Sequence, residues 1–137
     1  MKKDERLQIY NKYDGHCAYC GKPIKYEEMQ VDHLIPKNRG LHFRRDEDGN
    51  VTKRQGPDTM ENYMPSCRAC NFRKSDLCLE QFREEIKRQA EGLRKGAAKF
   101  QYKMSLAYGL IEEHLDKPII FYFERHQYEI QQKDKAR

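Results

Sequence analysis

Two Cys-x-x-Cys pairs constrain the fold of this chain more than any other feature of its sequence. Cys17 and Cys20 form the first pair, and Cys67 and Cys70 form the second. Each pair presents two sulfurs from one tight turn, and four thiolates suit tetrahedral Zn²⁺. We expect a closed structural zinc site that holds residues 21–66 at both ends, with no open position for a substrate. Free thiols or redox pairs are the alternative.

The composition agrees with a small domain that needs such a staple. The chain has 137 residues, of which 37% are hydrophobic and 36% charged, so its core is modest and a metal or a partner would stabilise it. The first residues, MKKDERLQIY, lack the apolar stretch of a signal peptide, and no segment approaches the roughly 20 apolar residues of a membrane span. We therefore expect a cytoplasmic protein with reduced cysteines, which more often bind metal than form disulfides.

The net charge of +5 favours an acidic partner such as nucleic acid, but only weakly. The positive charge gathers in residues 37–54 and 83–103. Charge alone favours the simpler interpretation, in which both runs are solvated faces.

Hydrophobic patterning predicts the elements around the cysteine pairs. A short helix is expected over residues 4–14, and extended strands over 29–35 and 60–66. The polar stretch 36–59 is expected to be a long functional or disordered loop, in which Asp48-Gly49 is a candidate hairpin tip.

The rest of the chain reads as helices followed by a strand. A helix is expected to start at about Ser75 or Asp76, with Leu79, Phe82 and Ile86 on its apolar face. A second helix is predicted by a stripe expected to serve core or helix-on-helix packing, made of Phe100, Met104, Ala107, Ile111 and Leu115. The segment IIFYF (119–123) predicts a strand, and the final residues QQKDKAR predict a loose tail.

The stretch VDHLIP (31–36) places Asp32 and His33 side by side in an apolar run. A buried charge without a partner costs several kcal/mol, so these two side chains need a reason to be there. Neighbours on a regular strand point to opposite faces. A site that uses both must therefore lie at a bend or a strand end, and Pro36 fits a strand that is about to stop.

Other residues complete a recognisable set. Asn62 lies in ENYMPSC, and the second cysteine pair continues into Asn71 in CRACNFRKS. Taken singly, His33 reads as a core histidine, Asn62 as a turn residue and Asn71 as a helix cap.

Together, the segments VDHLIP, ENYMPSCRACN and NFRKS resemble the three signature segments of the HNH endonucleases, the ββα-metal or His-Me finger nucleases, in their zinc-stapled form. The resemblance covers roughly residues 5–80. The third signature position is Asn71 instead of histidine, a common variation in the family. The stretch between His33 and Asn62 is longer than in compact members. The segment KPIIFYFE is similar to phage and mobile-element members.

The resemblance implies an α+β fold, with a ββα-metal nuclease core clamped by a four-cysteine zinc site and followed by C-terminal helices and a terminal strand. The core is expected to span residues 1–80, with an extension over 81–137 packed on it. A bacterial or phage-encoded protein is implied.

The resemblance also implies a metal-dependent DNA endonuclease that uses one divalent ion and leaves 5′-phosphate and 3′-hydroxyl ends. His33 suits a general base, because imidazole titrates near neutral pH. Asp32 and Asn71 offer oxygen donors that suit Mg²⁺ or Mn²⁺. Asn62 is expected either to orient the His33 imidazole or to pin the loop that carries it. The candidate DNA contacts are Arg73, Lys74, Lys37, Arg39, Arg44 and Arg45.

Two other functions stay open at this point. The chain could be a zinc-stapled nucleic-acid-binding module that does not cleave, or an interaction subunit whose C-terminal part docks a partner protein. A homodimer, the DNA preference and the biological role (homing, packaging, restriction or defence) are equally open. We expect packing or surface roles for the remaining candidates, which are Cys78, His16, His42, His114 and His126.

Overall fold

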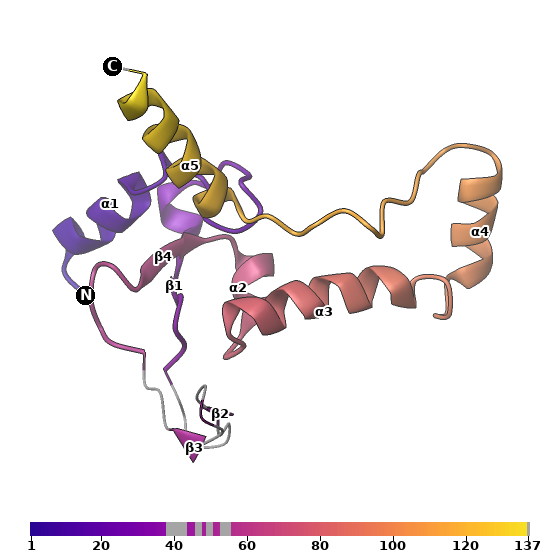
Figure 1. Ribbon diagram of the computed structural model, residues 1–137, viewed down its shortest axis with the longest axis horizontal. Helices are drawn as coiled ribbons and strands as arrows, with labels where there is room; N and C mark the ends of the chain where they lie inside the picture. The colour runs from indigo at the N-terminus through magenta and orange to yellow at the C-terminus, as the bar shows by residue number, and fades with distance from the viewer. Residues whose placement is uncertain (38–43, 46–47, 49–50, 53–55, 137) are drawn as a thin grey trace. The chain divides into compact units, whose positions relative to one another are not determined.

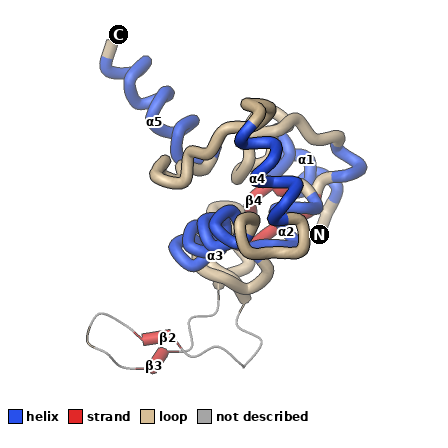
Figure 2. Tube along the Cα trace, turned by 90° about the vertical axis from the view of Figure 1, so that its right-hand side faces the viewer, coloured by secondary structure: helices blue, strands red, loops and turns tan. Residues whose placement is uncertain are grey.

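The structure is a computed structural model that describes residues 1–37, 44–45, 48, 51–52 and 56–136 (Figure 1). The chain divides into two compact units: the first unit is Met1–Leu79 with Ile120–Arg137, and the second unit is Glu80–Ile119. We expected residues 81–137 to form one extension, whereas this division groups residues from 120 onward with the first unit. Along the tube in Figure 2 the strands lie between α1 (Lys3–Asn11) and α2 (Arg68–Lys74), and among the described residues helices alone follow from α2 onward. In the described part of the chain, no helix is long and apolar enough to cross a membrane.

The first helix, α1 (Lys3–Asn11), confirms the helix expected near the N-terminus. The carboxylate of Glu5 accepts the backbone N–H of Lys2 at 2.9 Å, which satisfies one free donor at the helix start. Ile9 is fully buried. The chain then turns through Asp14 and Gly15, whose φ values of 53° and 74° lie in the left-handed region that ends helices.

The two strands predicted over residues 29–35 and 60–66 pair with each other. The strands β1 (Gln30–His33) and β4 (Tyr63–Ser66) form an antiparallel sheet in which Asp32 lies opposite Met64 and His33 opposite Tyr63. A second antiparallel pair, β2 (Arg44–Arg45) with β3 (Val51–Thr52), lies on either side of Asp48, as the hairpin prediction required. The short 3-10 helix η1 (Tyr26–Glu28) leads into β1.

A short helix, α2 (Arg68–Lys74), follows β4 and lies against β1. It carries Cys70 and Asn71 in its middle. It ends at Ser75, whose φ of 47° is unusual for a residue with a side chain. The next helix, α3 (Leu79–Gly92), begins a few residues later than the sequence predicted, with Phe82 buried on its apolar face. The β1, β4 and α2 elements together make the ββα arrangement that the resemblance implied.

The strand predicted over residues 119–123 is wrong. The helix α5 (Tyr122–Lys135) occupies this region, and the loose tail predicted at the end is also helical up to Lys135. The backbone N–H groups of Tyr122 and Phe123 donate to the carbonyls of Tyr19 (3.0 Å) and Ala18 (2.8 Å). The segment therefore satisfies its donors on the first cysteine turn instead of on a neighbouring strand.

Aromatic packing explains why the apolar segment 119–123 has the alternating pattern of a strand. Phe121 and Phe123 are buried, and both rings approach Tyr19 edge-on, with centroids 5.6 and 6.3 Å away. Tyr13 contacts Phe123 and His126 at 6.5 and 5.3 Å between ring centroids. Alternate phenylalanines are thus buried on the first unit at the start of a helix. Alternation in such a short run does not distinguish this case from a strand.

The second unit contains α3 from Glu80 onward and α4 (Lys99–Ala107). The helix α4 is shorter than predicted, because the chain leaves the helix after Ala107 and Gly109 has a φ of 69°. Phe100 and Met104 are 69% and 56% exposed. Core packing, one of the two roles expected for this stripe, is therefore wrong for these two residues in the unit as described.

An ion pair between Arg94 and Glu113 joins two segments of the second unit and makes its stability depend on pH. Arg94 Nε lies 2.6 Å from Glu113 Oε1, and the Tyr102 hydroxyl donates to the same oxygen at 2.7 Å. Arg94, and then Tyr102, lower the pKa of Glu113 to about 2. Since this folded-state pKa lies below the usual 4.5, the contact stabilises the fold above the unfolded-state pKa and is lost as pH falls towards 2.

We expect Glu113→Gln to be less stable than the native chain at pH 7 and to match it at pH 2. Denaturant unfolding of both chains over this pH range measures the difference. A difference that does not change with pH would contradict the assignment.

Candidate functional site

The four cysteines of the two pairs meet in the first unit. Their sulfurs all lie within 4.8 Å of one another, and Cys20 Sγ lies 3.9 Å from Cys67 Sγ. Cys67 precedes α2 and its sulfur accepts the backbone N–H of Cys70 at 3.4 Å, so one helical turn orients two sulfurs. The arrangement confirms that the pairs converge, and it fits a tetrahedral metal such as zinc.

Backbone hydrogen bonds hold the first cysteine turn in place. The N–H of Gly21 donates to the carbonyl of Cys17 at 2.9 Å, and the N–H of Ala18 donates to Pro65 of β4 at 2.8 Å. Gly21 has a φ of 77°, and a Cβ there would lie 2.8 Å from the Tyr122 ring. Glycine is therefore required at this position for both its backbone conformation and its size.

The cysteine thiols form hydrogen bonds with one another, and a bound metal ion would take the place of the shared protons. Their mutual hydrogen bond lowers the pKa of Cys17 and raises the pKa of Cys70, while burial raises the pKa of Cys20. Since a metal ion binds thiolates, its binding would release the shared protons and would weaken at low pH.

His33 stands at the end of β1 with its ring partly accessible, at 22% exposure of the side chain. Its Nε2 lies 2.8 Å from Oδ1 of Asp58, and its ring meets the Tyr63 ring edge-on at 5.2 Å. The other oxygen of Asp58 lies 2.7 Å from the Lys37 ammonium. Lys37, and then His33, lower the pKa of Asp58. Asp58 therefore stays ionised and holds the imidazole in one orientation.

Asp58 was missed by sequence reasoning. It lies in the polar stretch between Gly56 and Asn62, where nothing in the pattern separates it from other acidic loop residues. A carboxylate on the second ring nitrogen is the usual partner of a histidine base.

Asn62 forms hydrogen bonds with the loop after His33, and its two expected roles, orienting the imidazole or pinning this loop, stay predictions. Its side-chain oxygen accepts the N–H of Ile35 at 2.8 Å, and its amide nitrogen donates to the carbonyls of Ile35 and Pro57, both at 3.0 Å. Gly56 packs against this point, where a Cβ would lie 1.6 Å from the Ile35 carbonyl oxygen. Asn62 therefore contacts the backbone of the loop.

Asp32 is buried, at 7% exposure, and has two cationic or polar partners. The ammonium of Lys74 lies 3.0 Å from its Oδ2, and the hydroxyl of Tyr19 donates to the same oxygen. Burial, and then the Asp32 charge, raise the pKa of Tyr19, so this hydroxyl keeps its proton. Both contacts use the same carboxylate oxygen of Asp32.

The expected contact between Lys74 and phosphate is wrong for this structure. Lys74 is 0% exposed, and its ammonium also donates to the backbone carbonyl of His33 at 2.8 Å. The helix α2 turns this side chain inward, one turn after Cys70, where it compensates the buried Asp32 charge. A lysine in that position ties α2 to β1 and has no reach to an external ligand.

Removing the Lys74 charge is expected to cost much stability. Lys74→Met leaves Asp32 as a buried charge with Tyr19 alone, so the free energy of unfolding should fall by about 3–5 kcal/mol. Denaturant unfolding of the zinc-loaded protein measures the loss. The matched control is Lys74→Met with Asp32→Asn, which removes the orphaned charge and should recover part of the stability. An unchanged single variant would show that the pair is not buried as described.

The alternation of β1 explains how Asp32 and His33 share one strand. Asp32 contacts Lys74 of α2 on one face, and His33 lies with Tyr63 on the other. The strand stops at His33 and the chain bends through Leu34 and Ile35. The two side chains therefore point to opposite faces at the place where the strand ends.

Asn71 and Arg73 are the other two candidate site residues on α2. Asn71 is half-buried, and no side-chain hydrogen bond joins it to another described residue. Arg73 is exposed, with its guanidinium 5.7 Å from the Phe72 ring centre. The Asn71 amide is therefore open to a ligand, and Arg73 is accessible to a phosphate.

The remaining DNA-contact candidates lie in the segment between the two cysteine pairs. Lys37 is exposed but paired with Asp58. Arg44 and Arg45 form β2 through their backbones, and their side chains, like Arg39, lie outside the described residues.

The other flagged residues have ordinary surroundings. His16 stacks on Tyr122 at 5.3 Å, His126 lies 3.5 Å from Asp14, and His114 lies 3.2 Å from Glu112. Cys78 is half-buried and does not belong to the cysteine cluster. His42 lies outside the described residues.

Comparison with known proteins confirms the resemblance. Residues 17–77 match the family model described as HNH endonuclease, a range that includes all four cysteines and His33, Asn62 and Asn71. This segment of the chain is therefore similar to the HNH endonuclease family.

Two longer proteins are similar to part of this chain. A CRISPR-associated endonuclease Cas9 of Corynebacterium diphtheriae is 27% identical over 71 residues, which is 52% of this chain and 5% of the relative. The crystal structure of the Type II-C Cas9 enzyme from Actinomyces naeslundii matches with a TM-score of 0.43 and 20% identity, over 64% of this chain and 9% of that chain. The chain thus spans only a small part of each.

Proposed function

We propose that this chain is a metal-dependent DNA endonuclease that hydrolyses phosphodiester bonds with His33 as general base. The observation that carries the proposal is the pairing of His33 with Asp58 at an accessible strand end. Such a carboxylate fixes the ring and stabilises the imidazolium that forms when the base takes a proton. Because Nε2 faces Asp58, the opposite nitrogen, Nδ1, is the one that takes a proton from the attacking water.

Asp32 and Asn71 would hold one divalent ion, Mg²⁺ or Mn²⁺. The contacts of Asp32 with Lys74 and Tyr19 both use Oδ2, which leaves Oδ1 as the donor for a metal, and the Asn71 amide oxygen is a second hard ligand. Such an ion would stabilise charge on the phosphorus centre and on the leaving 3′ oxygen. Tyr19 and Lys74 hold Asp32 in place, and Asn62 holds the loop after His33.

The cysteine cluster has a separate role in this proposal. A zinc ion bound by four thiolates has no open position, so it would staple α2 to the first cysteine turn and take no part in the chemistry. The substrate is proposed to be DNA, as the resemblance implies, and the exposed Arg73 is the described candidate for a phosphate contact.

A non-cleaving nucleic-acid-binding module is the second candidate function. The observation that favours it is the ion pair between Lys74 and Asp32, which already neutralises the carboxylate that a catalytic ion would need. The two functions differ in their requirement for Mg²⁺, because a binding module needs only the structural zinc.

Incubation of zinc-loaded protein with supercoiled plasmid tests the proposal. We expect nicking with Mg²⁺ or Mn²⁺, none when the divalent ion is left out, and products whose ends a DNA ligase can rejoin. A folded, zinc-loaded protein that binds DNA but leaves the plasmid intact with every divalent ion would favour the binding module instead.

A further inference from the structure

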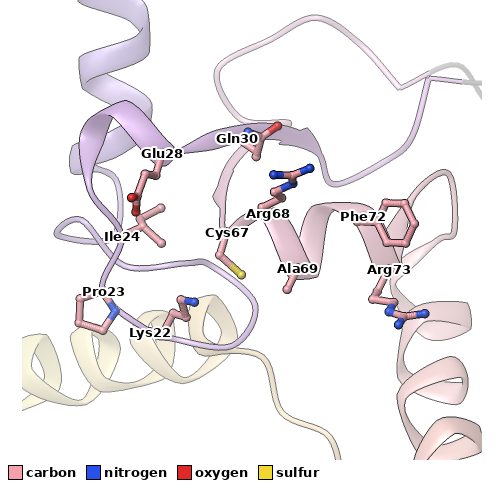
Figure 3. A pocket seen from close by; sticks show the side chains of 10 residues that line it. All are labelled: Lys22, Pro23, Ile24, Glu28, Gln30, Cys67, Arg68, Ala69, Phe72 and Arg73. Atoms are coloured by element: carbon pink, nitrogen blue, oxygen red, sulfur yellow. The ribbon is translucent and has the colours of Figure 1, made fainter.

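A pocket of about 840 Å³ lies in the first unit (Figure 3). The end of the first cysteine turn, at Lys22 and Ile24, lines one side together with Glu28 of η1. The outer face of α2 lines the other side with Arg68 and Phe72. Of the residues that line it, the function proposed above uses only Cys67, in the cysteine cluster, and Arg73, as a phosphate contact.

The spacing along α2 explains what this face presents. Cys70 and Lys74 turn inward, so Arg68 and Phe72, four residues apart, share the outer face. Arg73 lies beside them. All three side chains are exposed, and Phe72 is 74% exposed. A ring this exposed is accessible to a ligand in the pocket.

The charges around the pocket select the chemistry of that partner. Lys22, Arg68 and Arg73 are cationic, and Glu28 is the single acidic side chain of the lining. Among the described residues, these four form no ion pair with one another or with other residues. The Arg73 guanidinium lies 5.7 Å from the Phe72 ring centre. Unpaired cations around an open aromatic ring are the combination that binds single-stranded nucleic acid, through stacking on the ring and contacts to phosphate.

The pocket is also close to the proposed active site along the chain. Gln30, on its rim, precedes His33 by three residues in β1, or about 10 Å of extended strand. Phe72 directly follows Asn71. A strand of nucleic acid held at His33 therefore reaches the pocket within one or two nucleotides.

We propose that this pocket binds an unpaired nucleotide of the substrate, with its base stacked on Phe72 and its phosphate between Arg68 and Arg73. The inference rests on the proposed function, because it takes the substrate strand to lie at His33. In a continuous duplex the bases are stacked on each other, and reaching Phe72 would require unpairing. The enzyme thus prefers DNA that is single-stranded next to the cut, as in a flap, a loop or a displaced strand.

Binding measured without cleavage tests the pocket separately from the chemistry. Zinc-loaded His33→Ala protein is titrated, with no added Mg²⁺, into a fluorescent single-stranded oligonucleotide and into the duplex of the same sequence. Adding Phe72→Ala should weaken single-strand binding by about tenfold and leave duplex binding within about twofold. Tyr128→Ala is the matched control, because Tyr128 is an exposed aromatic residue outside the pocket (63% exposed), and it should change neither.

Each outcome decides one of the two ideas. Equal losses on both substrates, or no loss on either, would overturn the pocket proposal, and an acidic peptide or a protein surface would then be the better occupant. If the native chain does not cut DNA but single-strand binding depends on Phe72, the nuclease proposal fails and the pocket stands. A Phe72→Tyr variant, which keeps a stacking ring, should retain single-strand binding and excludes loss of folding as the cause.

Discussion

Replacing Cys67 with serine is expected to unfold the first unit. Cys67 contributes one sulfur to the four-sulfur cluster and also caps α2 by accepting the N–H of Cys70. Structural zinc in small domains contributes on the order of 10 kcal/mol or more to folding, which exceeds the whole stability of most domains of this size. Loss of one thiolate should therefore release the metal and disorder α2, β1 and β4 together.

Zinc content and far-ultraviolet circular dichroism of the purified variant measure this result. The matched control is Cys78→Ser, because Cys78 is a cysteine of the same chain outside the cluster, and this variant should keep its zinc and its helix signal. A Cys67→Ser protein that stays folded and active would contradict the zinc staple.

The second large effect is expected at His33, where alanine should remove cleavage and leave the fold intact. A positioned general base contributes about 10²–10⁴-fold to a rate, so the loss should reach this range. The fold should survive because Lys74 donates to the backbone carbonyl of His33, which alanine retains. Antiparallel pairing with Tyr63 also uses the backbone alone.

Asp58→Asn provides a graded companion to this variant. The amide keeps the shape of the side chain but removes the charge that stabilises an imidazolium. We expect a smaller loss of cleavage rate than in His33→Ala, with zinc content unchanged. Equal rates for Asp58→Asn and the native chain would assign Asp58 to the surface pairing with Lys37 alone.

The parts of the site that sequence reasoning predicted are those with short-range chemical constraints. Two cysteines separated by two residues can serve one metal wherever the intervening chain goes, so the cluster followed from spacing. The strand end at His33 followed from two adjacent polar residues and from Pro36, because a regular strand could not use both. Asn62 could be assigned to the loop after His33, but its hydrogen bonds to Ile35 and Pro57 come only from the structure.

The residues that sequence reasoning misassigned depend on contacts between distant segments. Lys74 reads as a surface lysine, since burial of its ammonium needs the carboxylate of Asp32 from another element. The sequence around Asp58 does not indicate its role, because its partner His33 lies 25 residues earlier in the chain. The segment IIFYF alternates like a strand, but its donors pair with carbonyls of the first cysteine turn and its chain continues as α5. Such pairings are tertiary, and local pattern does not encode them.

The central claim is that His33 at the end of β1 is the base of a metal-dependent nuclease. The most direct test compares supercoiled-plasmid nicking by the native protein and by His33→Ala, purified identically and matched for zinc content, in the presence of Mg²⁺. We predict metal-dependent nicking by the native protein and a loss of at least about 10²-fold in the variant. Equal nicking by both proteins would contradict the account, since the activity would then come from another residue or from a contaminating nuclease.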